Sequence, residues 1–447
     1  MKELIKDPLI LLAIAIVGFV FLLLAFQYAT KPKNADLLEK MVVIGALFLI
    51  TQPTIGPLLL LHPEGLTAHE ASAISYLARI VPYSAVIFVL KYRYIKILQF
   101  SLMLFVLDPA LAVLQVIVLL SFTWSETPSY SLKGAIVQVG LTIFSAYIAQ
   151  RYSWHDICKF IRFSLGILAV LNLLYSVAVP SVGVGFKGWR GILGHENSTS
   201  SLMGLSGGLW LFEAYVNSQN RRLAIGMFLI SILIVQNANS AGGKVQLMAL
   251  IASVLWLSFL KRLNFKLALT GVIILLIFVI SGTIIFLENT ETIVVDVLGK
   301  DMTFNGRIPL WTNLMGAIAN SPFLGYGYHG FWQEWRGEDN PAVAYATNDY
   351  GWTAPHAHNG FLEIVLYTGI VGFILFAISF FKTIVFGVIY LIRSENQEAV
   401  LPLAMITILV VSNISLSQLM DIHPMWMYYV MITVRLSVNV ERNENSS

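Results

Sequence analysis

The chain has 447 residues, of which 57% are hydrophobic and 12% are charged, and its mean hydropathy is +0.75. Soluble domains carry about twice this charged fraction, so the composition excludes a soluble globular protein. The formal net charge of +3 is small and spread over short loops, which excludes an extended nucleic-acid-binding surface. The single cysteine, Cys158, excludes an internal disulfide.

Apolar runs recur along the chain, each long enough to cross roughly 30 Å of hydrocarbon as a helix. Backbone polar groups in lipid must bond within their own helix, so the predicted fold class is an all-α polytopic transmembrane helical bundle of about twelve spans. No internal repeat or low-complexity linker divides it, so we predict a single integral membrane domain, 1–447. The predicted spans are 9–27, 41–61, 73–90, 101–122, 132–149, 157–179, 198–215, 223–238, 245–260, 267–287, 359–381, 400–417 and 425–440.

Two of these predicted spans contain helix-breaking residues. The second contains Pro53 and Pro57, and the fourth contains the pair Asp108-Pro109. Proline removes a backbone hydrogen bond and clashes with the preceding turn. Either segment could therefore be kinked, broken or re-entrant.

Basic residues gather in alternate loops between the predicted spans. The positive-inside rule places such loops in the cytoplasm, so the loops 123–131, 180–197, 239–244 and 288–358 are expected on the outer side. Counting spans back from this assignment puts the N-terminus outside, which the lysines near that end do not favour. The side of the N-terminus therefore stays open.

The large periplasmic loop, 288–358, is the long polar interruption of the sequence, and it concentrates arginine, histidine, tryptophan and glycine. A short helix is predicted within it, because Asn305 can cap a helix and Pro309 suits its first turn. Asn320-Ser321-Pro322 ends this helix, and the glycine-rich GYGYHG turns the chain back. Apolar residues recur at helical spacing at Ile308, Trp311, Met315 and Ile318.

Three positions on the predicted outer face offer cations near the ends of apolar runs: Arg190 in GWRGILGHEN, Lys244 in NSAGGK and Arg307 in NGRIPLW. They suit an anionic ligand, because guanidinium holds phosphate oxygens bidentately and lysine offers a compact charge. Each alone could instead extend to the headgroup level. Three on one face favour a ligand-binding role.

His195, His356 and His358 are the candidate proton-transfer groups, because neutral imidazole is a competent base near neutral pH. Any one of them could instead hydrogen-bond the backbone of a loop. The two histidines of PHAH without further ligands do not make a metal site, and no DxD motif for a divalent ion is present. We therefore predict no metal and no cofactor.

Asn359 directly precedes an apolar run, so it can cap the helix that enters the membrane and hold His358 at its mouth. Glu363 falls one turn further along this helix. It could orient a hydrogen-bond donor or an arginine, but a carboxylate in a first turn is also favoured by the helix dipole alone.

Other residues have roles that the sequence leaves open. Trp332, Trp335 and Trp352 could stack on sugar rings, but tryptophan also populates every membrane interface. Acidic residues in or beside apolar runs are expected to pair with basic residues that the sequence does not name. These acids are Asp108, Glu213 and Asp421.

The motifs together resemble the O-antigen ligase and polysaccharide polymerase superfamily of bacterial envelopes. The resemblance covers most of the chain from SFTWSETPSYSLKGA onward. It is carried by FTWSETPSYS, GWRGILGHEN, NGRIPLWTNLMGAIANSPFLGYGYHGFW and PHAHNGFLEIVLYTGIVG, of which the last two are the more specific. The wording of GWRGI…HEN and PFLGYGYHGFW is closest to the exopolysaccharide polymerase branch.

This resemblance implies a GT-C-like fold and a metal-independent, inverting glycosyltransferase. The histidine of a family His-Asn pair acts as the base, here His358 followed by Asn359. The arginine of a family Gly-Arg motif is matched by Arg307. A second family arginine is matched by Lys244, which keeps the charge but loses the bidentate fork, so its contact should be looser. The implied diphosphate-binding residues are Arg307, Lys244 and Arg190, with His195, Asn359, His356 and Glu363 in support.

The implied donor is a polyprenyl-diphosphate-linked glycan, and the implied acceptor is a glycan, lipid A core or protein. We favour a polymerase, with an O-antigen ligase as the close second; a chain-length regulator could associate. The implied location is the bacterial cytoplasmic (inner) membrane, multi-pass, with the active site facing the periplasm and in contact with membrane lipid. The alternative is a transporter or flippase of lipid-linked glycans, which would place polar residues along a path through the bilayer.

Overall fold

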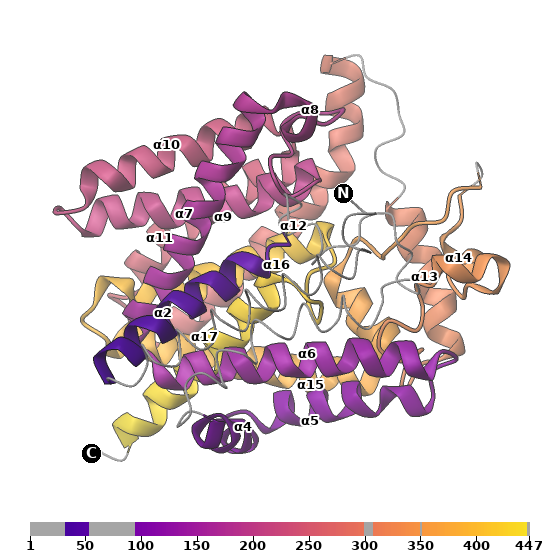
Figure 1. The fold of residues 1–447 in the computed structure, drawn as a ribbon, viewed down its shortest axis with the longest axis horizontal. Helices are drawn as coiled ribbons and strands as arrows, with labels where there is room; N and C mark the ends of the chain where they lie inside the picture. Colours follow the sequence, from indigo (N-terminus) through magenta and orange to yellow (C-terminus); the bar gives the residue numbers. More distant parts are fainter. Residues whose placement is uncertain (1–31, 53–93, 299–306, 349–350, 445–447) are drawn as a thin grey trace, which may run out of the picture.

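The computed structural model describes residues 32–52, 94–298, 307–348 and 351–444. Within these ranges the chain is helical, with two isolated β-bridges and no named strand, so the predicted all-α class is confirmed (Figure 1). The α-helices are α2 (Pro32–Leu49), α4 (Tyr94–Leu107), α5 (Pro109–Leu120), α6 (Pro128–Arg151), α7 (Trp154–Ala178), α8 (Pro180–Gly183), α9 (Glu196–Val216), α10 (Arg221–Asn237), α11 (Ala241–Leu260), α12 (Phe265–Leu298), α13 (Arg307–Asn320), α14 (Val343–Ala346), α15 (Gly360–Arg393), α16 (Leu401–Ser415) and α17 (Pro424–Glu444). Short 3-10 helices are η2 (Ser121–Thr123), η3 (Glu334–Asp339) and η4 (Gln397–Val400).

Six of the described helical segments are long and apolar enough to cross a membrane. They lie in α6, α7, α11, α12, α15, and α16 together with η4. Each predicted span from 132–149 onward coincides with a helix. The predicted spans 9–27 and 73–90 lie outside the described residues, so the count of about twelve stays a prediction.

The predicted span 101–122 is broken at Asp108-Pro109, where the chain turns by 114° between α4 and α5. Pro109 begins α5, and the Asp108 carboxylate caps its first turn. The same carboxylate accepts from the Ser379 hydroxyl at 2.9 Å and lies 3.7 Å from Lys382 Nζ, both in α15. The helix break predicted from the proline is therefore present. The Asp108 carboxylate at this break is paired with polar side chains of the neighbouring helix α15.

The acid inside α9 also has a basic partner. Glu213 lies 3.0 Å from Arg162 of α7, and both side chains are less than a tenth exposed. The guanidinium also lies over the Trp210 ring. The two charges offset each other where neither could be solvated alone.

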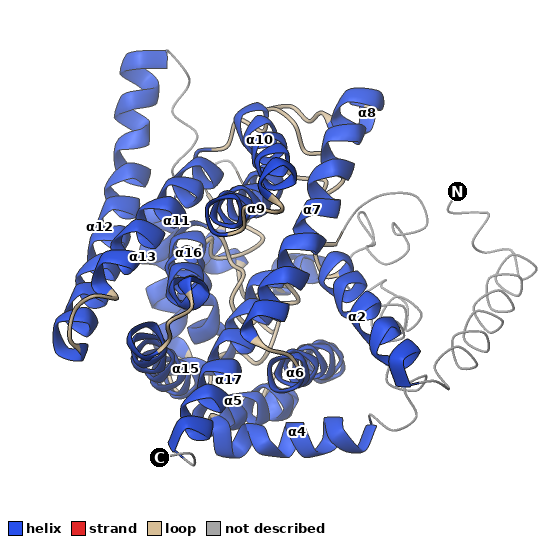
Figure 2. Ribbon diagram, turned by 90° about the vertical axis from the view of Figure 1, so that its left-hand side faces the viewer, coloured by secondary structure: helices blue, strands red, loops and turns tan. Residues whose placement is uncertain are grey.

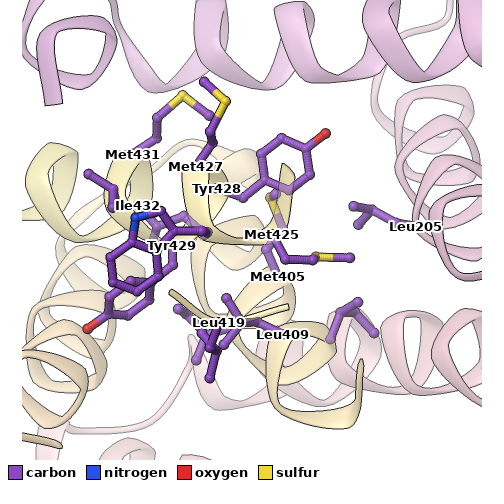
Figure 3. Close-up of a cluster of buried hydrophobic side chains, with 14 of the residues drawn as sticks. Leu205, Met405, Leu409, Leu419, Met425, Met427, Tyr428, Tyr429, Met431 and Ile432 are labelled. Atoms are coloured by element: carbon purple, nitrogen blue, oxygen red, sulfur yellow. The ribbon is translucent and has the colours of Figure 1, made fainter. Parts of the chain in front are cut away.

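Helices α16 and α17 form the centre of the bundle. Every residue of α16 is buried, and α17 packs against α6 and α15. Figure 3 shows side chains of α16 and α17, among them Met405, Leu409, Met425 and Tyr428, in one buried cluster with Leu205 of α9. A helix surrounded by protein is apolar on all its faces, which explains the largely apolar sequence of α16.

Helices α9, α10 and α11 lie together in both views of the bundle (Figures 1 and 2). A Cβ atom at Gly243 of α11 would lie 1.9 Å from Ser200 Oγ and 2.4 Å from Ser200 O of α9, so only glycine allows this approach. The Ser240 hydroxyl donates to Asn197 Oδ1 at 2.9 Å. The N-terminal ends of α9 and α11 are therefore fixed beside each other.

Helix α15 has 34 residues, is longer than predicted, and is interrupted at Gly369 (φ 63°, ψ −169°). The loop that follows α13 bonds to its backbone on both sides of this break. Tyr326 N donates to Leu366 O, and Ile370 N donates to Pro322 O, both at 2.8 Å. This loop is thus hydrogen-bonded directly into α15.

The predicted helix of the long loop is confirmed as α13, which ends at Asn320 as expected, with α14 and η3 following it. Its predicted cap, Asn305, lies outside the described residues. Helix α12 continues to Leu298, so the chain remains helical beyond the predicted loop start at 288. The segment between α12 and α15 therefore carries short helices, as predicted.

The α9–α11 contact gives a test of the fold. Gly243→Ala should destabilise the protein by about 1 to 3 kcal/mol, because the new methyl group meets the Ser200 backbone. Gly226→Ala in α10 is the control, since a Cβ atom there has nothing within 4 Å and should leave stability unchanged or slightly higher. Thermal unfolding in detergent measures both, and equal behaviour of the two variants would contradict the close approach.

Candidate active site

The predicted catalytic histidine lies immediately before α15. Asn359 Oδ1 accepts from the N–H groups of Phe361 and Leu362 at 3.0 and 3.2 Å, so the predicted cap is confirmed. Asn359 N donates to Ser417 Oγ at 3.2 Å, which attaches the cap to the loop between α16 and α17. His358 has a left-handed backbone (φ 52°), uncommon for a non-glycine residue, and is held at the mouth of the helix.

Glu363 is 1% exposed and binds groups on three segments. Its carboxylate accepts from Trp332 Nε1 and from Ala357 N, both at 2.7 Å, and also interacts with the Ser417 hydroxyl. Ala357 is the residue between His356 and His358. The carboxylate therefore positions the histidine segment against α15. A carboxylate that only balanced the helix dipole would not need these specific hydrogen bonds.

His356 and His358 form a close pair, with ring centroids 4.0 Å apart. His358 N donates to His356 Nδ1 at 3.2 Å, which requires that nitrogen to be unprotonated. Burial, and then electrostatic interaction with His356, Arg307 and His195, lower the pKa of His358 to about 3. Burial lowers the pKa of His356 to about 4, although Asp421 acts in the opposite direction. Both imidazoles are therefore neutral at pH 7, and His358 Nδ1 is buried without a hydrogen-bond partner among the described residues.

Arg307, the first residue of α13, is close enough to act electrostatically on both histidines. Burial lowers the pKa of its guanidinium, and no carboxylate of the described residues forms an ion pair with it. Trp311, one turn further along α13, donates from Nε1 to Ala357 O at 2.9 Å. The helix is thus fixed to the histidine segment, and within the described residues its cation has no ion-pair partner.

His195 also joins this group. It caps α9, where its Nδ1 accepts from Asn197 N at 3.1 Å, and its positive form would lower the pKa of both His356 and His358. Through Asn197 and Ser240 it is connected to the start of α11. The structure therefore brings together residues that the sequence separates by more than a hundred positions.

Arg190 and Lys244 lie at the adjoining helix ends. Arg190 Nε donates to Val182 O at 2.8 Å, so one edge of its guanidinium is used within its own loop. Lys244 is in the first turn of α11, where a side-chain atom at Gly242 would lie 3.9 Å from Ser415 Oγ of α16. The described contacts place the two cations at the starts of α9 and α11, and they do not join either one to His356 or His358.

Sequence reasoning missed His329 and left Asp421 without a partner. His329 Nε2 lies 3.8 Å from Asp421 Oδ1, and the His329 ring stacks on Tyr367 of α15 at 5.3 Å. The sequence feature that could have marked His329 as a site residue was its position between the glycines of GYGYHG. The signal for Asp421 was a carboxylate beside an apolar run.

The FTWSETPSYS segment packs against the loop after α13. Trp124 Nε1 donates to Leu324 O at 3.1 Å, and Ser121 Oγ accepts from Tyr328 N at 2.9 Å. Arg336 forms an ion pair with Glu126 at 2.6 Å. Two of the motifs that carry the family resemblance are therefore parts of one polar region.

The described residues contain no group of three or more histidine, cysteine, aspartate or glutamate side chains arranged to hold a metal ion. The chemistry available from them is that of neutral imidazoles next to cations and helix N-termini. Such a site can accept a proton and stabilise an anion.

The fold and this site define a multi-pass, all-helical membrane protein whose histidines and cations gather where several helices begin. A family model described as O-antigen ligase matches residues 225–377. The matched region holds Lys244, Arg307, His358, Asn359 and Glu363, whereas Arg190 and His195 precede it.

The chain is also similar to the exopolysaccharide production protein ExoQ of Rhizobium meliloti (strain 1021), with 32% identity over 108 residues. That match spans 24% of this chain and 24% of the relative, about a quarter of each. Together the two findings confirm the resemblance to the O-antigen ligase and polysaccharide polymerase superfamily.

The neutral histidines predict how stability changes with pH. Because burial lowers the pKa of His356 from 6.5 to about 4, the unfolded chain binds more protons between these values, and stability falls as the pH drops below 6.5. Between pH 7 and pH 5 the wild type should lose about 1 to 2 kcal/mol more than His356→Gln. Thermal unfolding in detergent measures this, and equal losses would mean that the folded protein does not hold this imidazole neutral.

Proposed function

We propose that this protein is a membrane glycosyltransferase that transfers or polymerises glycan from a polyprenyl-diphosphate-linked donor, at the outer face of the cytoplasmic membrane. The observation that carries the proposal is the neutral His358 near Arg307, whose cation has no ion-pair partner in the part of the chain that the structure describes, within the region that matches the O-antigen ligase model. A base and an anion-binding group are the two elements that displacement of a diphosphate requires.

His358 is the proposed base. It takes the proton from an acceptor hydroxyl, whose oxygen attacks the anomeric carbon while the bond from that carbon to the diphosphate oxygen breaks. Attack opposite the leaving group inverts the anomeric configuration. A bound diphosphate beside the imidazole would raise its low pKa toward the range in which a base is effective.

Arg307 is the main proposed ligand of the departing diphosphate, since guanidinium binds phosphate oxygens bidentately. The starts of α9, α13 and α15 lie at the same site, and each contributes the positive end of a helix dipole. Lys244 and Arg190, at the adjoining ends, would hold the more distant part of the same anion. Lipid diphosphate is a good leaving group, so we expect the reaction to need no metal.

Polymerase activity is the preferred form of this proposal, with O-antigen ligase as the second. The similar protein of Rhizobium meliloti is named as an exopolysaccharide production protein, which favours joining of repeat units. The two activities differ in the acceptor. A transporter would instead need unpaired polar groups across the bundle, whereas Asp108 and Glu213 are each paired with a cation.

Turnover tests the assignment of the base and the cation. With the purified protein, polyprenyl-diphosphate-linked repeat units and EDTA present, the wild type should form a ladder of products. His358→Ala should lower kcat at least about a hundredfold, because it removes the general base. Arg307→Lys should retain more activity than Arg307→Ala, because lysine keeps the charge without the fork.

His155→Ala is the control, since this exposed histidine at the start of α7 pairs with Glu398 and should leave turnover unchanged. Full activity of His358→Ala in a correctly inserted protein would overturn the mechanism. Transfer only after lipid A core or a protein acceptor is added would change the assignment to ligase. No transfer to any acceptor would make transport the leading function.

The outer-face placement has a separate test. Glu338→Cys in η3 and Arg222→Cys at the start of α10 are both exposed, and the native Cys158 is buried, so background labelling should be low. A membrane-impermeant maleimide added to spheroplasts should label Glu338→Cys but label Arg222→Cys only after permeabilisation. The opposite pattern would place the site on the cytoplasmic side.

A further inference from the structure

A second group of side chains lies beside the histidine site and has no part in the steps above. It consists of Tyr130 at the start of α6, His329 in the loop after α13, Trp335 in η3, and Asp421 between α16 and α17; we name it the aromatic–carboxylate cluster. The rings of Tyr130 and Trp335 meet edge to face at 4.4 Å, and Tyr130 lies 6.3 Å from His329. The Asp421 carboxylate is 3.8 Å from His329 Nε2.

This cluster reaches solvent while its supports are buried. The side chains of His329 and Asp421 are 26% and 40% exposed, and Tyr130 and Trp335 are partly exposed. Tyr367, on which His329 stacks, is buried in α15 one turn after Glu363. A ligand could therefore contact the cluster without displacing the core.

The two aromatic residues are held in place by polar contacts between their segments. Arg336, next to Trp335, pairs with Glu126 and also donates to Gln333 Oε1 at 3.0 Å. Gln333 in turn donates to the Thr127 hydroxyl. These bonds fix η3 against the start of α6 and pair the Arg336 cation with a carboxylate.

His329 adopts a left-handed backbone (φ 55°), and so does Met420 directly before Asp421 (φ 51°). Such conformations are strained for a residue with a side chain and concentrate where ligands bind. The same strain at His358 accompanies the proposed catalytic base. The His329–Asp421 contact therefore joins one residue with a positive φ, His329, to a residue that directly follows another, Met420.

Asp421 connects the cluster to the chemistry. Burial lowers the pKa of His356, and the Asp421 carboxylate is close enough to act against that effect. The cluster therefore adjoins the histidine pair on the side of Asp421, whereas Arg307 contributes positive charge to the pair. The two neighbouring regions offer opposite chemistries, a cationic one and one with a carboxylate and aromatic rings.

We propose that the aromatic–carboxylate cluster is the acceptor subsite, binding one sugar ring of the glycan whose hydroxyl reacts. This inference rests on the proposed function. Tyr130 and Trp335 offer apolar ring surfaces to the C–H face of the sugar, and Asp421 and His329 bind its hydroxyl groups. The Asp421 carboxylate disfavours a phosphate in this cluster, so the lipid diphosphate binds on the Arg307 side.

The structure also separates the three tryptophans of the loop. Trp332 is 9% exposed and bonded to Glu363, so it is not available to a sugar. Trp352 is 56% exposed, and its backbone is bonded to Asn348 in the turn after α14. Trp335 is the one of the three that lies in the cluster, which makes Trp352 a matched control.

The test uses the full-length protein in detergent and the neutral oligosaccharide released by mild acid from the host strain's polysaccharide. Saturation-transfer NMR should show binding to the wild type and to Trp352→Ala, and a signal at least about threefold weaker for Trp335→Ala and Asp421→Asn. In turnover, the latter two variants should raise the acceptor KM about tenfold and leave the donor KM unchanged. Trp335→Phe should restore most of the binding, which a merely structural defect would not predict.

An unchanged acceptor KM in Trp335→Ala and Asp421→Asn would overturn the subsite while transfer by His358 still stands. Oligosaccharide binding that requires Trp335, in a protein that transfers no glycan, would support the subsite and count against the proposed function. Absence of oligosaccharide binding to the wild type would overturn the subsite. Greater loss with Trp352→Ala than with Trp335→Ala would do the same.

Discussion

The buried carboxylate of Glu363 is the interaction on which the site depends. It binds Trp332, Ala357 and Ser417, which belong to three segments that meet at the start of α15. A carboxylate that is almost unexposed is costly unless several donors surround it. The hydrogen bonds that offset this cost are also those that hold the histidine segment in place, so the stability of this corner and the geometry of the site have one physical origin.

Backbone strain follows the same region. The non-glycine residues with positive φ in the described chain are Gln52, Asn239, His329, His358 and Met420. Gln52 donates from Nε2 to Ile422 O, and Asn239 precedes the Ser240 cap of α11. Two of the five, His358 and Met420, directly adjoin residues of the histidine site and of the His329–Asp421 contact. Strain of this kind persists only where the surrounding structure fixes it.

Hydropathy predicted the helices well because a lipid-spanning segment must be long and apolar whatever its neighbours are. Local residues also predicted the break at Asp108-Pro109, the Asn359 cap and the end of α13 at Asn320, since each depends on bonds within a few residues. The count of about twelve spans is not settled by the helices described.

Long-range pairing was beyond sequence reasoning, because hydropathy does not specify which face of a helix meets which neighbour. His329 and Asp421 come together from distant loops, and Arg162 meets Glu213 across α7 and α9. The grouping of His195 with Arg307 and the PHAH histidines likewise depends on how α9 and α13 pack. The residue types of the site were visible in the sequence, whereas its division into a cationic side and an aromatic side depends on packing.

The interruption of α15 at Gly369 has a mechanical consequence. Continuous backbone hydrogen bonds transmit a tilt along the axis of a helix. At Gly369 the series of helical bonds in α15 is interrupted, and Leu366 O and Ile370 N bond to Tyr326 N and Pro322 O of the loop instead. The loop holds both parts of α15, because it bonds to Leu366 before the break and to Ile370 after it. A change in bilayer thickness that tilts the second part would therefore act on this loop as well as on the start of α15.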